Sequence, residues 1–347
     1  MQAVRPYIQS LRMLGWIPAY FALTMGFLDS GLCSLVNVFT TAIVTGLILG
    51  PGFVVNYISD VELDRKSHVK KAFLKEQQPF LTGKLSPRAG YTFAFILTAI
   101  GLALASTVNL SVALLACYGT VIGYIYSIGP RLKAKPFFDV AANASTFGIA
   151  SYMTGFATCR TLAAVSMYPL IWIGLLAASA YIAIGMIDAP DDYFAGIKNT
   201  TTVLGMKSSL KLAAVLFGTS VMAYLIGLVT FTPSLSYLIM LPFLVGATAT
   251  FIVIRRHRTI AKAYIVGTRM SVLFCSVATL TLFATYLGLA AAGMDQALLQ
   301  ATFRALTSVI VMMATGWILW RFRKIAALMP AEWLPIEKVL AQVRQTK

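Results

Sequence analysis

Long apolar segments separated by short polar ones make up most of the chain. A run of about 18 or more apolar residues is long enough to cross the hydrocarbon core of a bilayer as a helix. The pattern predicts ten such helices: Met13–Leu32, Leu35–Ile58, Gly90–Val108, Leu110–Ile128, Val140–Ala157, Leu162–Ile187, Leu212–Phe231, Leu235–Ile254, Met270–Ala292 and Phe303–Phe322. The first and last are the least regular, because Asp29 and Arg304 lie near their ends. The sequence therefore predicts an all-α, polytopic transmembrane helical bundle of nine to ten helices around a central cavity.

Composition supports a membrane-embedded chain. Hydrophobic residues make up 59% of the 347 and charged residues only 12%, with a mean hydropathy of +0.79. Soluble domains carry about 25% charged residues. The first apolar segment is too long for a cleavable signal peptide and lacks a small-residue cleavage site. We expect one membrane domain, residues 1–322, followed by a short cytoplasmic tail, residues 323–347.

The net charge of +16 could indicate a nucleic-acid partner. The distribution of the basic residues along the chain indicates a different origin for this charge. With the N-terminus in the cytoplasm, all of the 28 Lys and Arg residues except Arg160 and Arg304 fall on the inner side. Such asymmetry is the positive-inside rule of membrane proteins. We therefore expect an integral protein of the cell (inner) membrane, with the lipid bilayer as a partner and no nucleic acid.

The four cysteines, Cys33, Cys117, Cys159 and Cys275, are scattered one to a helix or helix end. Their spacing matches neither a zinc motif nor a disulfide framework. The sequence therefore favours small apolar packing residues over bonded cysteines.

Two groups of acidic residues are arranged for metal chemistry. In the first, Asn56, Asp60 and Asp64 follow at four-residue steps, so on a helix they share one face. In the second, Asp188 and Asp192 repeat that spacing. Like charges this close repel unless a cation lies between them, and Mg²⁺ prefers carboxylates together with substrate phosphates. The four aspartates are thus candidate Mg²⁺ ligands for a diphosphate.

Solvated helix ends could also carry such acids, and for one pair this would be the simpler interpretation. Two pairs that follow separate helices toward the same membrane face favour a functional site, because carboxylates at membrane depth are costly.

Basic residues accompany both acidic groups. Lys70 and Lys71 follow the first group and Lys198 follows the second, while Arg131 and Lys133 lie between them. Cationic side chains stabilise the charge that develops on a leaving diphosphate. Loop lysines and arginines also mark membrane topology, so the hypothesis of a catalytic role rests mainly on Arg131 and Lys133; the three others are candidate substrate contacts.

Asp139 and Asn143, again four residues apart, lie at the predicted start of the fifth helix. Capping of that helix is the simpler interpretation. The alternative is contact with the acceptor substrate, since the cytoplasmic mouth of the site should be close.

Four segments, in order along the chain, resemble the signatures of the UbiA superfamily of intramembrane prenyltransferases. The first acidic group resembles NDxxDxxxD, the second a DxxxD with following Gly and Thr, and two others resemble RPIxSGxLS and YSxPPxRLK. The residues that match are Asn56, Asp60 and Asp64; Asp188, Asp192, Gly196 and Thr200; the run from Gln78 to Ser86; and the run from Tyr126 to Lys133.

The chain departs from the family pattern at several positions. Tyr57 replaces the usual Asp after Asn56, and Gln78 replaces the usual Arg before Pro79. Asp191 stands where quinone-pathway members have Gly, and a tenth span exceeds the usual nine. The resemblance implies metal binding, but with Tyr57 in place of the usual Asp the site has one potential metal ligand fewer.

The resemblance implies a Mg²⁺-dependent enzyme that transfers a prenyl group from a prenyl diphosphate to a lipophilic acceptor and releases diphosphate. The acceptor would be an aromatic quinone precursor or a polyene; the run 195–205 is closer to members that act on polyenes. Asn56, Tyr126, Arg131 and Lys133 are its candidate catalytic residues, with the active site facing the cytoplasm.

Two alternatives stay open. A terpene cyclase of the same superfamily would ionise the same substrate without an acceptor. A secondary transporter would carry its acids near helix midpoints.

Overall fold

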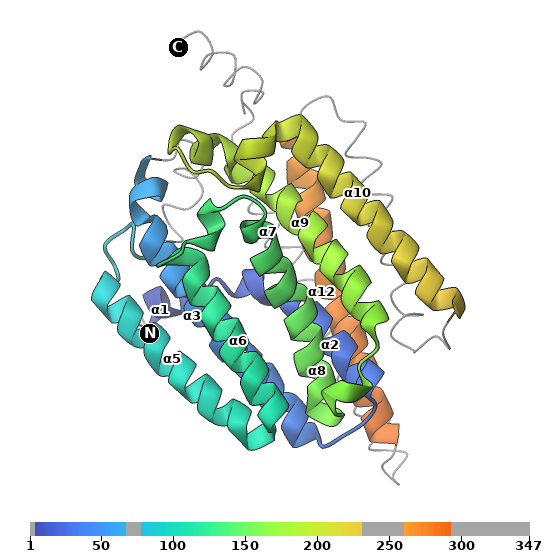
Figure 1. Ribbon diagram of the computed structural model, residues 1–347. Helices are drawn as coiled ribbons and strands as arrows, with labels where there is room; N and C mark the ends of the chain where they lie inside the picture. The colour runs from blue at the N-terminus through green and yellow to red at the C-terminus, as the bar shows by residue number, and fades with distance from the viewer. Residues whose placement is uncertain (1–3, 67–77, 231–259, 293–347) are drawn as a thin grey trace.

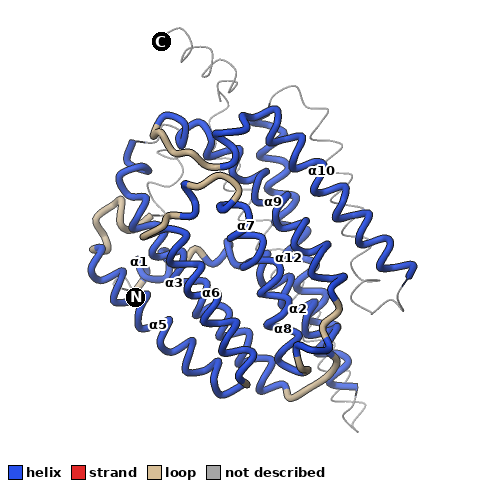
Figure 2. The backbone as a smooth tube through the Cα atoms, viewed as in Figure 1, coloured by secondary structure: helices blue, strands red, loops and turns tan. Residues whose placement is uncertain are grey.

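The computed structural model describes residues 4–66, 78–230 and 260–292, and every regular element within these ranges is helical (Figures 1 and 2). The elements are α1 (Arg5–Ser10), η1 (Met13–Trp16), α2 (Ile17–Ser30), α3 (Leu35–Lys66), α5 (Pro87–Val108), α6 (Leu110–Ser127), η2 (Leu132–Ala134), α7 (Phe138–Asn143), η3 (Ala144–Ala150), α8 (Ser151–Cys159), η4 (Leu162–Ala164), α9 (Met167–Phe194), α10 (Thr200–Thr230) and α12 (Ile260–Ala292).

Seven helices in these ranges are long and apolar enough to cross a membrane, which confirms the predicted all-α transmembrane fold. The fifth predicted span appears as α7, η3 and α8, which follow one another without a break. Its middle portion, η3, is a π-helix. The predicted spans Leu235–Ile254 and Phe303–Phe322 and the predicted tail, residues 323–347, lie outside the described residues, so the count of nine to ten stays a prediction.

Two helices run further than the hydropathy indicates, and both carry the acidic residues. The predicted second span ends at Ile58, whereas α3 continues to Lys66. The predicted sixth span ends at Ile187, whereas α9 continues to Phe194. The predicted ends of both helices were therefore too early, because polar residues extend these helices beyond their apolar portions.

Helices α2 and α8 pack with their backbones in contact, and two glycines make this possible. A Cβ atom at Gly26 would lie 2.1 Å from the carbonyl oxygen of Tyr152, and one at Gly155 would lie 2.0 Å from that of Leu23. Small residues of this kind let membrane helices approach closely. On either side, α12 packs against α2, and α9 packs against α10 and η3.

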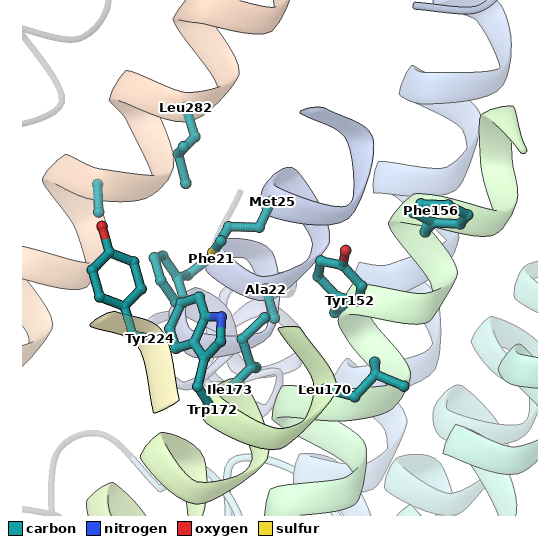
Figure 3. Packing of buried hydrophobic residues seen from close by; sticks show 11 residues of the cluster. Phe21, Ala22, Met25, Tyr152, Phe156, Leu170, Trp172, Ile173, Tyr224 and Leu282 are labelled. Carbon is teal, nitrogen blue, oxygen red and sulfur yellow. The ribbon is translucent and has the colours of Figure 1, made fainter. Parts of the chain in front are cut away.

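A cluster of buried side chains fills the space between α2, α8, α9, α10 and α12 (Figure 3). Trp172 is fully buried and meets Tyr224 edge to face, with ring centroids 5.4 Å apart. Tyr152 belongs to the same cluster, and its hydroxyl donates to Asp29 at 2.9 Å. Tyr152 is thus part of this packed cluster.

The close approach of α2 and α8 also brings two cysteines together. Cys33 and Cys159 form a disulfide with their Cα atoms 5.3 Å apart, so the expectation of unbonded cysteines was wrong for this pair. The bond spans 126 residues, which is why spacing could not indicate it. Cys117 and Cys275 are free.

The helix connections separate into two ends of the bundle. The disulfide and the α5–α6 and α8–α9 connections lie at one end, and the carboxyl ends of α3 and α9 lie at the other, beside the start of α10 and the segment that precedes α7 (Figure 1). The fold therefore gathers the acidic residues at a single end.

Candidate active site

The first acidic group lies on the last turns of α3, facing the segment that follows α6. Asp60 accepts a hydrogen bond from Nζ of Lys133 at 2.5 Å. The same ammonium donates to the hydroxyl of Ser59 at 2.7 Å. Further back on the helix, Nδ2 of Asn56 donates to the hydroxyl of Ser127 at 3.1 Å. The two segments that resemble family signatures thus meet side chain to side chain.

Asp64 is the most deeply buried carboxylate of this group, at 3% exposed. Its Oδ2 accepts a hydrogen bond at 2.8 Å from Nε2 of Gln78. Gln78 opens the turn that leads to α5 and also donates to the backbone carbonyl of Tyr57 at 3.2 Å. The turn between α3 and α5 therefore holds the end of the acidic helix in place.

The second acidic group lies on the last turns of α9. Asp191 and Asp192 are buried and Asp188 is half-buried. Oδ2 of Asp192 accepts from Nδ2 of Asn199 at 2.6 Å, and Oδ1 of Asn199 caps the start of α10 by accepting from the backbone N–H of Thr202 at 2.9 Å. One asparagine thus fixes both the metal-ligand candidate Asp192 and the next helix.

Asp139 holds the same junction from the other side. Its carboxylate accepts hydrogen bonds from the backbone N–H of Thr200, at 3.1 Å, and from the Thr200 hydroxyl. That hydroxyl in turn accepts from the backbone N–H of Phe137 at 2.7 Å. Burial raises the pKa of the Asp139 carboxyl, while the hydrogen bonds from Thr200 act in the opposite direction. Asp139 therefore bonds to the start of α10 as well as to backbone groups at the start of its own helix, α7.

A pair of tyrosines, Tyr126 of α6 and Tyr181 of α9, interacts with both acidic groups. The hydroxyls of Tyr126 and Tyr181 are 2.6 Å apart, and Asn143 hydrogen-bonds to Tyr126. The Tyr126 hydroxyl interacts electrostatically with Asp60, and that of Tyr181 with Asp188. The pair thus joins α6 to α9, and its two hydroxyls interact with one carboxylate of each acidic group.

Arg12 is the basic residue that both acidic groups share. Its guanidinium lies 5.8 Å from the ring centre of Phe53 and 5.7 Å from that of Tyr57, in cation–π contact with α3. It also interacts electrostatically with Asp60, Asp64 and Asp188. Carboxylates of both acidic groups therefore interact with one positive charge.

Within the described ranges, no three His, Cys, Asp or Glu side chains lie close enough together to form a ready-made metal site. The carboxylates are held by groups of the chain itself: Lys133 on Asp60, Gln78 on Asp64 and Asn199 on Asp192.

The other predicted site residues are placed less closely. Arg131 and Lys198 are exposed, and Lys70 and Lys71 lie outside the described residues. The catalytic role of Arg131 and the substrate contacts of the three lysines stay predictions. Both acidic groups lie at helix ends. A transporter would need its acids near helix midpoints.

Sequence reasoning missed several residues that touch this site. Arg12 was counted only among the inner-side charges, although a charge so near an apolar segment is a functional candidate. Tyr181 lies seven residues before Asp188, and so on the same helical face, a signal that could have found it. Asn199 gave no comparable signal.

The chain matches known proteins over most of its length. The model of the UbiA prenyltransferase family matches residues 15–276. A digeranylgeranylglyceryl phosphate synthase from Saccharolobus solfataricus is 28% identical over 218 residues, which are 62% of this chain and 74% of that one. The enzyme of the same name from Methanopyrus kandleri is 26% identical over 267 residues, 75% of this chain and 90% of that one.

Solved structures show the same fold. A UbiA homolog from Archaeoglobus fulgidus, bound to GPP and Mg²⁺, superimposes with a TM-score of 0.66 at 23% identity, covering 80% of this chain and 99% of that one. An apo UbiA homolog from Aeropyrum pernix K1 gives a TM-score of 0.62 at 15% identity, covering 77% and 96%. With a family match that spans most of the described helices, this chain belongs to the UbiA prenyltransferase family and is an integral-membrane prenyltransferase.

Proposed function

We propose that this enzyme uses Mg²⁺ to transfer a prenyl group from a prenyl diphosphate to a lipophilic acceptor, with release of diphosphate, at the end of the bundle where α3 and α9 finish. The observation that carries the proposal is the shared environment of the two acidic groups. Both groups lie at the same end of the bundle (Figure 1), and Asp60, Asp64 and Asp188 all interact electrostatically with the guanidinium of Arg12.

The donor set fits a hard divalent cation. Asp60, Asp64, Asp188 and Asp192 offer only oxygen atoms, which Mg²⁺ prefers, and these would hold it. Bound there, Mg²⁺ would neutralise charge on the diphosphate and so weaken the bond to the prenyl group.

The chain's own cations would complete the diphosphate site. Lys133 already lies at the carboxylates, through Asp60, and exchange of this contact for a phosphate oxygen would place its charge on the leaving group. Arg12, the residue before η1, interacts with the same carboxylates, and its side chain is held over Phe53 and Tyr57. The Tyr126–Tyr181 pair, held by its own hydrogen bond, would form a wall for the prenyl group.

The relatives suggest which acceptors to test. The enzymes that match over most of their length are named digeranylgeranylglyceryl phosphate synthase, which makes a glyceryl phosphate lipid the first acceptor to try. An aromatic quinone precursor and a polyene are the acceptor classes that the sequence itself suggests. One UbiA homolog structure holds GPP and another DMAPP, each with Mg²⁺, so these are suitable donors.

We also infer that the acidic end faces the cytoplasm. The positive-inside distribution favours this orientation. The Cys33–Cys159 bond lies at the opposite end, and disulfides persist in oxidising compartments outside the cytosol. An impermeant maleimide applied to intact cells should label Thr107→Cys, near the disulfide end, and spare Lys198→Cys until the cells are opened; the reverse pattern would invert the orientation.

The activity is tested with the purified full chain in nanodiscs, given GPP or DMAPP, with and without Mg²⁺. Diphosphate release and prenylated product are measured with a geranylgeranylglyceryl phosphate, an aromatic acid or a polyene as acceptor. We expect product with one acceptor class and none in EDTA.

Each other outcome has a definite meaning. If a cyclic hydrocarbon forms without any acceptor, the enzyme is a cyclase and not a transferase. Product formation that persists in EDTA would contradict the metal assignment. Release of no diphosphate from any donor would contradict the proposed function as a whole.

A further inference from the structure

Gln78 is buried against the first acidic group in a rigid setting. Its side chain is 0% exposed. The turn that follows is closed by the backbone N–H of Leu85, which donates to the carbonyl of Pro79 at 3.2 Å. Phe80 and Leu85 pack into one buried cluster with Tyr57. The position of the Gln78 amide is therefore determined by the packing of its neighbours.

The amide of Gln78 has its nitrogen fully used and its oxygen without a donor. Nε2 donates to Asp64 Oδ2 at 2.8 Å and to the Tyr57 carbonyl at 3.2 Å. Oε1 is buried and, among the described residues, meets no hydrogen-bond donor. The amide cannot be turned over, because its oxygen would then face two acceptors. A buried acceptor held in this way is costly unless a ligand satisfies it.

We propose that Gln78 is a positioning residue for the metal site: its nitrogen fixes the Asp64 carboxylate, and its carbonyl oxygen accepts a hydrogen bond from a water molecule carried by the bound Mg²⁺. This inference rests on the proposed function. Mg²⁺ usually keeps several of its waters in proteins, and partners of this outer kind orient the ligands. The unpartnered oxygen is the feature that a purely structural role for Gln78 leaves unexplained.

The neutral charge of Gln78 has a second consequence. An arginine at this position would place a positive charge beside Asp64 and compete with a metal cation. Glutamine supplies the hydrogen bond without that charge. We therefore expect this chain to bind Mg²⁺ in the absence of diphosphate, and a variant with arginine to need diphosphate first.

The test measures metal binding and not turnover. The thermal unfolding midpoint of the full chain in detergent is followed against Mg²⁺ alone and against Mg²⁺ with inorganic pyrophosphate. Gln78→Met keeps length and packing but removes both polar ends. It should raise the half-saturating Mg²⁺ concentration about 10- to 100-fold, and saturating Mg²⁺ should restore most diphosphate release. An unchanged half-saturation, within about two-fold, would overturn the proposal.

Two further variants make the result specific. Gln78→Arg keeps a hydrogen-bond donor to Asp64 but adds a positive charge. Because of that charge, it should weaken binding of Mg²⁺ alone more than binding of Mg²⁺ in the presence of pyrophosphate. Equal effects would contradict the charge argument. Asn109→Leu removes another structural amide, which donates to the Ala157 carbonyl at 2.8 Å at the disulfide end. It should lower the midpoint and leave Mg²⁺ half-saturation unchanged.

Failure of this inference and failure of the proposed function give different results. A normal Mg²⁺ response in the unaltered chain without any diphosphate release would refute the function and leave Gln78 testable by binding. If the unaltered chain shows no Mg²⁺ response, both the metal site and the role of Gln78 are refuted.

Discussion

Lys133 and Asp60 form an ion pair across 73 residues of sequence, with Nζ 2.5 Å from Oδ1 and side chains only 11% and 15% exposed. A pair this sheltered from solvent leaves an uncompensated charge when one partner is removed. In the enzyme without ligands, Lys133 therefore neutralises a carboxylate that the proposed reaction assigns to a metal ion. The pair links the state of the metal site to the segment after α6.

Lys133→Met should separate the two roles of this lysine. Without Mg²⁺, the variant should unfold at a lower temperature, because Asp60 loses its counter-charge. With Mg²⁺, the midpoint should recover while diphosphate release stays about 10²–10³-fold low, since one charge contact on the leaving group is gone. Thermal scans and a diphosphate assay on the same sample measure both effects.

Lys135 provides the matched control, because it is exposed and lies two residues away. Lys135→Met should change neither property. Arg131 is also exposed, and its role in holding diphosphate stays a prediction. If it has that role, Arg131→Ala will lose more activity than Arg88→Ala, another exposed arginine; equal rates would leave Lys133 as the basic residue of that segment.

Arg12 should matter for substrate binding more than for folding. It interacts electrostatically with Asp60, Asp64 and Asp188, and its guanidinium lies 5.7 Å from the ring centre of Tyr57. Arg12→Ala should raise the KM for the prenyl diphosphate about 10-fold, the equivalent of 1.4 kcal/mol, with Arg12→Lys in between. Arg5→Ala, at an exposed position, should leave the KM unchanged; a similar rise in both would indicate a general effect of charge.

The sequence could place the helices, because a bilayer demands continuous apolar runs and leaves few alternatives. It could also place Asn56, Asp60 and Asp64 on one face, since helical periodicity is local. The contacts that build the site are not local. Lys133 on Asp60, Asp139 on Thr200 and Gln78 on Asp64 each join separate elements, and no spacing rule indicates which loop returns to which helix end. The Cys33–Cys159 bond escaped prediction for the same reason.

Asp139→Asn should reveal a pH dependence of stability. Burial raises the pKa of Asp139, so the folded protein holds this proton more tightly than the unfolded chain does. Stability from this group is then complete below the ordinary pKa of aspartate, and it is lost as pH rises through the raised value. The midpoint of Asp139→Asn minus that of the unaltered protein should therefore increase as the pH rises above about 4, the ordinary pKa of aspartate. A difference that stays flat or falls would contradict the shift.

Gly155→Ala tests the backbone contact that positions the disulfide end of the bundle. A methyl group there would lie 2.0 Å from the Leu23 carbonyl oxygen, a rigid backbone atom, so α2 and α8 must move apart. Overpacking of this kind costs about 1–3 kcal/mol, and the separation should also slow formation of the Cys33–Cys159 bond, visible as free thiol by maleimide labelling. Gly218→Ala is the matched control: that glycine also lies inside a helix, but a Cβ atom there would meet nothing within 4 Å in the described part of the chain. Alanine favours a helix over glycine by about 1 kcal/mol, so Gly218→Ala should raise the unfolding midpoint where Gly155→Ala lowers it. If both substitutions raised the midpoint, α2 and α8 would have room to spare, and the close packing of their backbones could not be what holds the two cysteines together.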